Sequence, residues 1–334
     1  MAKQEIKTNE KFKTMIGGQA LIEGIMMRGP KKDAIVCRGK DGLTVEVSDR
    51  KTVPEKSLWR LPFLRGVRNF IDSQIVGVKA LLRSADLSPD EEDMPEEPSK
   101  FDLWLEEKLG SEKFQQVIIA IAAVMGIGLS VLLFFLLPMV VGGFFDGLVK
   151  SNLGINLIEG AIRIIIFSCY IILISRMKEM KRMFAYHGAE HKTIRCYEAQ
   201  LPLTVENVRI QTRLHPRCGT SFLLVVMILS ILVFSVASSA LLSVVPALEA
   251  IRGTIGYRLI MIAFKLLLLP VVVSISYEIN RLVGRYDNTL TRIVTAPGMW
   301  FQNFTTNEPD DSMIEVAIMA VEAVLPENEG DDKW

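Results

Sequence analysis

Histidine is scarce in this chain: its 334 residues include three, and all of them lie between positions 187 and 215. The cysteines are also few, and their spacing lacks the regularity of an extracellular disulfide framework; they are Cys37, Cys169, Cys196 and Cys218. The last two fall in the histidine-bearing segment, which favours reduced thiols that could bind a metal. Residues 1–40 contain no continuous apolar run, so no cleavable signal peptide is expected and membrane insertion would use internal helices.

The chain also has no net charge, because its 38 basic and 38 acidic side chains give a formal charge of zero. No direct nucleic-acid binding is evident. The charges are nevertheless unevenly placed, with an excess of basic groups in residues 1–84 and acids concentrated in residues 86–97 and near the C-terminus. The segment 86–100, rich in acids and prolines, cannot bury a core and is predicted to be a flexible linker.

Long apolar runs decide the class of protein. Residues 117–145 and 221–248 contain no charged side chain, and each run exceeds the roughly 20 residues that a helix needs to cross the hydrocarbon core. Two further runs carry a few charges: residues 157–175 include Glu159 and Arg163, and residues 259–277 include Lys265. The sequence therefore predicts about four transmembrane helices.

Basic side chains near the ends of these runs predict the orientation of the chain. Residues 176–219 contain nine Lys and Arg residues, whereas Lys150 is the one basic residue in the connection between the first two predicted spans. By the positive-inside rule, residues 176–219 and both termini should be cytoplasmic. The chain is thus predicted to be a multi-pass protein of the cell membrane.

The predicted fold is mainly α, a polytopic membrane protein with a small N-terminal cytoplasmic region that contains a β-hairpin and with a cytoplasmic His-rich hairpin. Its predicted parts are residues 1–85 with the hairpin and an amphipathic helix, the linker 86–100, a four-helix membrane domain at 101–285 with a candidate metal site at 186–220, and a C-terminal cytoplasmic segment at 286–334.

Two local patterns support the N-terminal assignment. Alternating residues at 34–38 and 43–47 flank an Asp-Gly pair, which is a strong hairpin signal. Residues 58–82 mix aromatic and basic side chains, which is typical of a helix on an anionic membrane surface, although a groove of a soluble partner would also fit. A glycine-rich run at 17–30 is interpreted as loop and strand, or as a segment whose Gln19 or Glu23 reaches the histidines.

The candidate site centres on the run Tyr186-His187-Gly188-Ala189-Glu190-His191-Lys192. On a helix, His187 and His191 would project from one face about one turn apart, a separation at which both imidazoles can bind one metal ion. Glu190 completes the order H-x-x-E-H, the inverse of a zinc-hydrolase motif in which the glutamate serves as general base.

A second run, His215-Pro216-Arg217-Cys218, supplies further ligands. If His187, His191 and one of His215 or Cys218 bind zinc, a water can complete the shell and the site is catalytic, with Glu190 as the base. If all four bind, the shell is closed and the zinc is structural. A hydrogen-bonded polar network without metal is the remaining alternative.

Several ordered motifs resemble the YqhQ family of bacterial membrane proteins over about residues 15–320. They are the run from Gly17 to Pro30, the runs His187–Thr193 and His215–Phe222, Ser276-Tyr277-Glu278, Pro297-Gly298-Met299-Trp300 and the run Thr305–Asp311. The resemblance implies a family of predicted metal-dependent enzymes whose activity is undetermined. It therefore agrees with a metal site and supplies no substrate.

Three functions are compatible with these observations. The first is a zinc-dependent hydrolase at the cytoplasmic membrane surface, acting on a lipid-linked or peptide substrate. The second is a membrane scaffold or assembly factor with a structural zinc, whose basic N-terminal face recruits a membrane-protein complex or the ribosome. The third is a transporter, suggested by Lys265 and Glu159 within predicted spans. The expected partners include membrane lipids, and nothing in the sequence fixes an oligomeric state.

Overall fold

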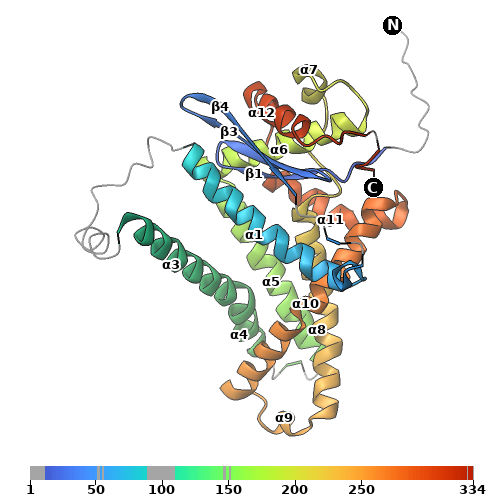
Figure 1. The fold of residues 1–334 in the computed structure, drawn as a ribbon. Helices are drawn as coiled ribbons and strands as arrows, with labels where there is room; N and C mark the ends of the chain where they lie inside the picture. Colours follow the sequence, from blue (N-terminus) through green and yellow to red (C-terminus); the bar gives the residue numbers. More distant parts are fainter. Residues whose placement is uncertain are drawn as a thin grey trace. The chain divides into compact units, whose positions relative to one another are not determined.

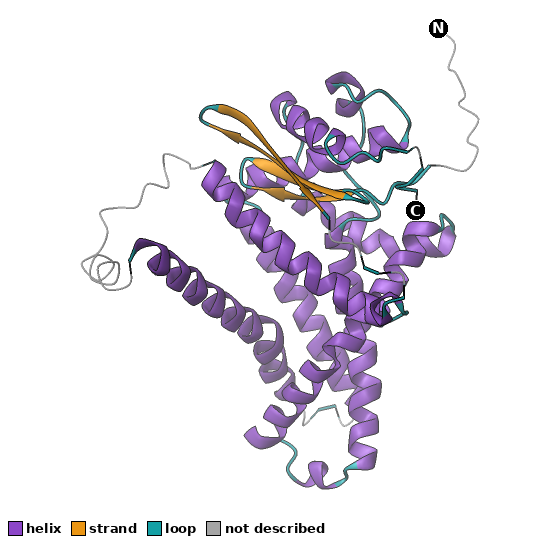
Figure 2. Cartoon of the chain, viewed as in Figure 1, coloured by secondary structure: helices purple, strands orange, loops and turns teal. Residues whose placement is uncertain are grey.

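The computed structural model describes residues 12–50, 53–54, 56–88, 110–145, 148–149, 152–328 and 330–333. The chain divides into two compact units, one made of Met1–Ser88, Ile171–Leu229 and Pro270–Trp334 and the other of Pro89–Tyr170 and Ser230–Leu269. Helices dominate the described residues, and one small sheet is present (Figure 2). The prediction of a mainly α fold is confirmed. The predicted linker lies largely outside the described residues.

The sheet of the first unit is an antiparallel meander near the N-terminus. Its strands, in the spatial order β1-β2-β3-β4, are β1 Gly17–Leu21, β2 Gly24–Arg28, β3 Lys32–Gly39 and β4 Gly42–Asp49. The predicted hairpin is confirmed as β3 and β4, whose register pairs Gly39 with Gly42 around a two-residue turn. The glycine-rich run at 17–30 forms a second hairpin, turning at Glu23 with φ of 47°.

Both faces of this sheet are covered by helices of the same unit (Figure 1). Helices α6 (Lys178–Glu198) and α12 (Asp311–Glu322) cover one face, and α1 (Leu64–Leu87) covers the other. Alternate residues of a strand point to opposite faces, so Met27 packs with α6 and α12 while Met26 packs with α1. The sheet thus fixes the position of α6, the helix that carries the H-x-x-E-H motif.

Three shorter helices also belong to this unit: η1 (Leu58–Arg60), which precedes α1, α7 (Val205–Arg209), which packs on α6, and α11 (Thr289–Thr305). Helix α12 begins after Asp310, whose side chain accepts a hydrogen bond of 3.0 Å from the Met313 amide and so caps the helix. The segment between α11 and α12 lies on α6, since the Asn307 amide donates to the Phe184 carbonyl at 2.8 Å.

The four predicted spans are confirmed as helices long and apolar enough to cross a membrane: Ala120–Gly143, Leu153–Ile174, Gly219–Val244 and Ile255–Arg285. The first combines α3 (Ser111–Val131), η3 (Leu132–Leu136) and α4 (Leu137–Gly143), and the others belong to α5 (Asn152–Ile174), α8 (Gly219–Val244) and α10 (Ile255–Arg285). The short α9 (Ala247–Ala250) lies between α8 and α10. The fourth helix continues beyond the predicted residue 277.

Candidate metal centre

Helix α6 carries His187 and His191 one turn apart, as the sequence predicts. Gly188 lies between them although glycine is a poor helix former. A Cβ at this position would lie 2.0 Å from the Asn307 carbonyl oxygen, a distance that no side chain tolerates. The glycine is therefore required by the close approach of the segment that follows α11, and the neighbouring Thr305 carbonyl contacts His187.

Three of the predicted ligands converge. A nitrogen of His187, a nitrogen of His191 and the Cys218 sulfur all lie within 4.8 Å of one another. His187 Nε2 is 3.2 Å from Cys218 Sγ, and the two imidazole centroids are 4.4 Å apart. Two imidazoles and a thiolate are typical zinc ligands, and this spacing lets them surround one ion after small side-chain adjustments.

Backbone carbonyls hold the outer nitrogen of each imidazole. His187 Nδ1 lies 2.8 Å from the Thr305 carbonyl oxygen, and His191 Nδ1 lies 2.6 Å from the Arg213 carbonyl oxygen. A carbonyl oxygen accepts a proton and cannot donate one, so the neutral form of each ring carries its hydrogen on Nδ1. The lone pair is then on Nε2, and a metal-binding histidine is ordinarily oriented by such a contact.

Glu190 lies beside the cluster and is buried. Its Oε1 accepts a hydrogen bond of 3.0 Å from the Gly18 amide of β1, and its Oε2 has no hydrogen-bond partner among the described residues. Burial raises the pKa of this carboxyl group, while the charges of His187 and His191 act in the opposite direction. Next to the candidate ligands, Glu190 thus has one hydrogen-bonded oxygen and one oxygen without a hydrogen-bond partner among the described residues, and its proton affinity is elevated.

Gly18 explains part of the glycine-rich run. A Cβ on Gly18 would lie 2.6 Å from the Met26 carbonyl oxygen and 3.1 Å from Glu190 Cδ, so this position needs glycine for close approach. The two side chains considered for this role act elsewhere. Gln19 donates to the Gly77 carbonyl at 3.5 Å, and Glu23 pairs with Arg182 at 2.5 Å.

The cluster stabilises a thiolate. Burial alone would raise the pKa of the Cys218 thiol, but the neighbouring His187 and His191 lower that pKa well below its ordinary value. Burial likewise tends to lower the pKa of His187, yet the negative Cys218 sulfur outweighs it and raises that pKa to about 9. The local charges therefore favour the ionised sulfur, which is the form that binds metal.

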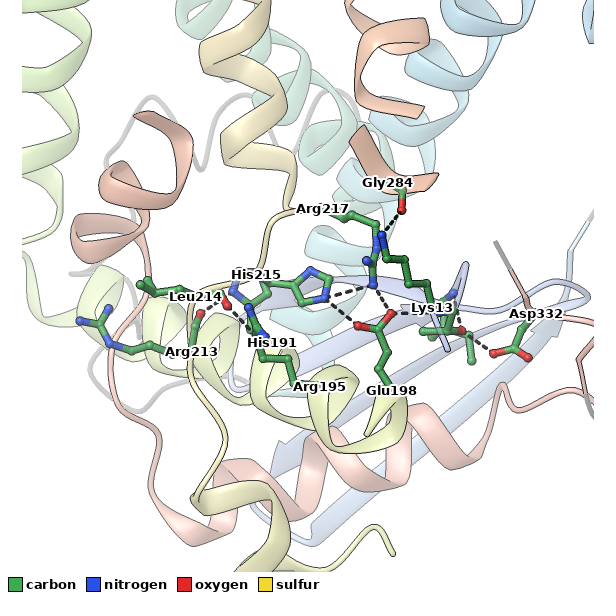
Figure 3. A network of polar contacts seen from close by, with 12 residues as sticks. Lys13, His191, Arg195, Glu198, Arg213, Leu214, His215, Arg217, Gly284 and Asp332 are labelled. Atoms are coloured by element: carbon green, nitrogen blue, oxygen red, sulfur yellow. Dashed lines mark hydrogen bonds and ion pairs between the residues drawn. The ribbon is translucent and has the colours of Figure 1, made fainter. Parts of the chain in front are cut away.

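The structure places His215 next to the cluster but outside it. Its ring centroid is 5.5 Å from that of His191, and its Nε2 lies 3.5 Å from Glu198 Oε2 (Figure 3). Burial lowers the pKa of His215 to about 4, so the ring is neutral at pH 7. Gln302 binds its backbone on both sides, accepting from the His215 amide and donating to the His215 carbonyl, each at 2.7 Å.

Glu198 is the centre of a second polar network (Figure 3). It pairs with Arg217 and accepts a 3.0 Å hydrogen bond from the Thr14 amide. Burial would raise the pKa of Glu198, but its hydrogen bond with His215 and the charge of Arg217 lower it overall. This network ties the residues before α8 to the end of α6, and so fixes the loop that carries Cys218.

Several residues of the site carry no signal in the sequence. The carbonyls of Thr305 and Arg213 and the amide of Gly18 are backbone groups, which every residue type possesses. Cys196, named as a possible ligand, is instead buried with Val208 and Ile314 in an apolar cluster. Two features of the sequence point indirectly to these backbone groups. The glycine-rich run at 17–30 contains Gly18, and the motif at 305–311 contains Thr305.

The fold and the site define a class: a mainly helical protein with four helices able to cross a membrane and a buried cluster of two histidines and a cysteine beside a carboxylate. The chain belongs to the DUF1385 family of proteins of unknown function, whose model matches residues 61–327. It is 33% identical over 315 residues to the "Uncharacterized protein YqhQ" of Bacillus subtilis (strain 168), an alignment that covers 92% of each chain. The resemblance to the YqhQ family is thereby confirmed. No solved structure matches the chain significantly.

Proposed function

We propose that this protein is a zinc-dependent hydrolase that acts at the cytoplasmic membrane surface on a lipid-linked or peptide substrate. The observation that carries the proposal is the convergence of His187, His191 and Cys218 within 4.8 Å while backbone carbonyls hold the outer nitrogen of both rings. Imidazoles oriented by these backbone contacts, together with an ionised thiolate, are a donor set that zinc prefers, and zinc binding would displace the proton between His187 Nε2 and the Cys218 sulfur.

The number of ligands favours an open shell. The sequence left His215 and Cys218 as alternatives for the third ligand, and the geometry favours Cys218, because His215 Nε2 is directed to Glu198. Zinc is usually four-coordinate, so three protein ligands leave one position for water or substrate. An open position distinguishes catalytic zinc sites from structural ones.

Zinc bound here would supply a Lewis acid and lower the pKa of a water molecule to about 7. Glu190 would act as the general base. Its elevated pKa suits proton transfer near neutral pH, and its Oε2 is free to accept a proton while the Gly18 amide holds Oε1 in place. The proton would then pass to the leaving group of the substrate.

The position of Cys218 in the chain supports action at a membrane surface. It directly precedes the helix Gly219–Val244, which is long and apolar enough to cross the bilayer. A ligand at the end of a spanning helix lies near the headgroups, where a membrane-associated substrate is concentrated. The excess of Lys and Arg in residues 176–219 assigns this end to the cytoplasm.

The second candidate is a scaffold with a structural zinc. It is favoured by burial, since His191, Glu190 and Cys218 are exposed by 2%, 5% and 6% respectively. A substrate would need a path to such a site, whereas a structural metal needs none. In this alternative Glu190 or a shifted His215 would close the shell, and the protein would act through a partner.

Metal analysis of the detergent-purified full chain tests the ligand assignment. We expect about one zinc per chain by mass spectrometry, lost in His191→Ala and Cys218→Ala and retained in His215→Gln, the matched control. Cobalt substitution should add a thiolate-to-metal absorption band, and acetohydroxamate should change the cobalt spectrum if the fourth position is open. Absence of metal from the native chain, or zinc loss in His215→Gln alone, would contradict the assignment.

Glu190→Gln separates the two candidates. The amide keeps the shape and an oxygen for the Gly18 amide but cannot serve as a base, so we expect zinc to be retained and the acetohydroxamate response to remain. Turnover, once a substrate has been found among lipid-linked and peptide amides and esters, should fall by about 100-fold or more. Loss of zinc in this variant, or a cobalt spectrum that acetohydroxamate leaves unchanged in the native chain, would favour the structural role.

A further inference from the structure

The second unit contains a cavity that the proposed hydrolase does not use. Its volume is about 60 Å³, whereas a single water molecule needs about 10–15 Å³ of such space. Four helices supply its walls, together with the connection between α9 and α10. The polar lining includes Glu159, Ser238, Arg252, Arg258 and Lys265, and the rest of the wall is largely apolar, with Leu242 among its residues.

The charges around the cavity, two of them buried and two half-buried, do not cancel. Lys265 pairs with Glu159 at 2.5 Å, and both side chains are less than one tenth exposed, so these two charges neutralise each other. Arg252 pairs with Glu249 at 2.8 Å. Arg258 is different, because no carboxylate among the described residues lies within ion-pair distance of it. The cavity therefore has an excess positive charge on Arg258.

Glycines on α4 make room for the charged side chains. A Cβ on Gly142 would lie 2.8 Å from Glu159 Cγ, and a Cβ on Gly143 would lie 2.7 Å from an Arg258 guanidinium nitrogen. The guanidinium of Arg258 thus lies directly against the backbone of α4 in place of a side chain. This contact holds a cation at the cavity wall when an arginine in a mainly apolar helix bundle would otherwise extend towards water.

A second polar group in the wall lacks a partner. Ser238 is 2% exposed, lines the cavity, and its hydroxyl has no hydrogen-bond partner among the described residues. Serines in apolar helices commonly donate to the carbonyl four residues earlier, as Ser235 does to Ile231 at 2.7 Å and Ser239 does to Ser235 at 2.9 Å. The Ser238 hydroxyl makes no such hydrogen bond. A buried hydroxyl without a partner is unfavourable unless a ligand satisfies it.

We propose that this cavity binds a phosphate group, with Arg258 as the charge partner and the Ser238 hydroxyl as a hydrogen-bond donor. A guanidinium matches two phosphate oxygens, and the ammonium group of Lys265, paired with Glu159, also lies in the cavity wall. The phosphate can belong to a phospholipid headgroup, whose acyl chains would follow the apolar wall, or to inorganic phosphate. The proposal is independent of the zinc chemistry, because every residue in it belongs to the other unit.

Binding to the full chain in detergent tests this site. Inorganic phosphate and short-chain phosphatidylglycerol are titrated separately, with a diacylglycerol of the same chain length as the lipid control without phosphate, and thermal stabilisation and native mass spectrometry report binding. We expect saturable binding of phosphate, phosphatidylglycerol or both. Phosphate alone would identify a free-anion site, and phosphatidylglycerol without phosphate would identify a lipid headgroup site.

Two variants locate the binding. Arg258→Gln removes a charge-assisted contact and should weaken affinity about tenfold or more, and Ser238→Ala removes one hydrogen bond and should weaken it severalfold. Arg292→Gln, an exposed arginine in the other unit, is the matched control and should bind as the native chain does. Ser238→Ala removes a single oxygen atom, so it should fold even if the Arg258→Gln variant fails to fold. The proposal is overturned if neither ligand saturates, or if Ser238→Ala and Arg258→Gln bind as tightly as the control.

Discussion

The candidate metal centre of the first unit and the cavity of the second unit both contain buried polar side chains, and these are held by different kinds of partner. At the metal centre the partners are backbone groups: carbonyls of Thr305 and Arg213 bind the histidines, and the Gly18 amide binds Glu190. At the cavity two buried charges hold each other, the ammonium of Lys265 and the carboxylate of Glu159. A backbone partner orients the side chain that it binds, whereas the pair of Lys265 and Glu159 serves mainly to neutralise two buried charges.

This difference has a physical consequence for each site. Peptide groups do not ionise and move little, so the imidazoles of the first unit are held in one tautomer with their Nε2 atoms directed inwards. The ammonium and carboxylate of the second unit depend on each other, and removal of one leaves an unpaired charge in an apolar bundle. The first arrangement suits a metal site of defined geometry, and the second suits a polar cavity.

The largest effect should come from breaking the buried pair. Lys265→Met leaves the Glu159 carboxylate without its partner, and unpairing a buried charge lowers the free energy of unfolding by about 3–5 kcal/mol. The double variant Lys265→Met/Glu159→Leu removes both charges and should recover most of that loss. Thermal unfolding in detergent measures both. If Lys265→Met is as stable as the native chain, Glu159 does not depend on Lys265 for neutralisation of its buried charge.

A smaller loss is expected at Gly188, where the backbone contact is direct. An added Cβ must move the Asn307 carbonyl, which it would approach to 2.0 Å, and overpacking of this kind costs about 1–3 kcal/mol. Because Thr305 holds His187, Gly188→Ala should also lower the zinc content. Gly219→Ala is the control, since nothing lies within 4 Å of its added Cβ. Equal zinc content and stability in both variants would contradict the assigned role of the 305–307 backbone.

An effect of similar size, spread over a pH range, is expected from His215. Its pKa is about 4 in the fold and about 6.5 in an unfolded chain, so between these values the unfolded chain binds more protons. Stability should therefore rise with pH across this interval, and it should fall by about 2 kcal/mol when the pH is lowered from 7 to 5.

Metal-free protein is the right sample for this measurement, because zinc binding has a pH dependence of its own. Other groups also affect the curve: the lowered pKa of Glu198 adds to the slope below pH 4.5, the raised pKa of Glu190 opposes it above pH 4.5, and the raised pKa of His187, about 9, acts above pH 6.5. The contribution of His215 is therefore the difference between the native chain and His215→Gln. His215→Gln should flatten the curve between pH 4 and 6.5. An unchanged slope in that variant would show that His215 is not buried as a neutral ring.

The sequence predicted the features that depend on local pattern. Apolar runs placed the four helices, an Asp-Gly pair with alternating neighbours placed the hairpin of β3 and β4, and the four-residue spacing placed His187 and His191 on one face of α6. Each of these follows from a repeat along the chain, either in helical period or in strand period.

The features that depend on tertiary contact were not predictable in this way. The sequence could not decide between His215 and Cys218, because contacts with other segments set the direction of each side chain: Glu198 lies against the His215 ring, and His187 lies against the Cys218 sulfur. The groups that bind Nδ1 of His187 and His191 are backbone carbonyls, which every residue type has, so the sequence does not reveal them. Glycine was the one indirect signal, since Gly18 and Gly188 mark the two places where another backbone group comes closest to the site.

The contacts of Glu190 and His187 also have a consequence for the order in which the protein matures. Helix α6 meets Gly18 from the beginning of the chain and Thr305 from near its end, so its site is assembled from segments almost 290 positions apart. Such long-range contacts form late in folding, because the ribosome releases the later segment only after the spanning helices have been synthesised. The pocket for the ion is therefore completed only when synthesis is nearly finished. Loading of zinc would then be one of the last events in biogenesis, after insertion into the bilayer.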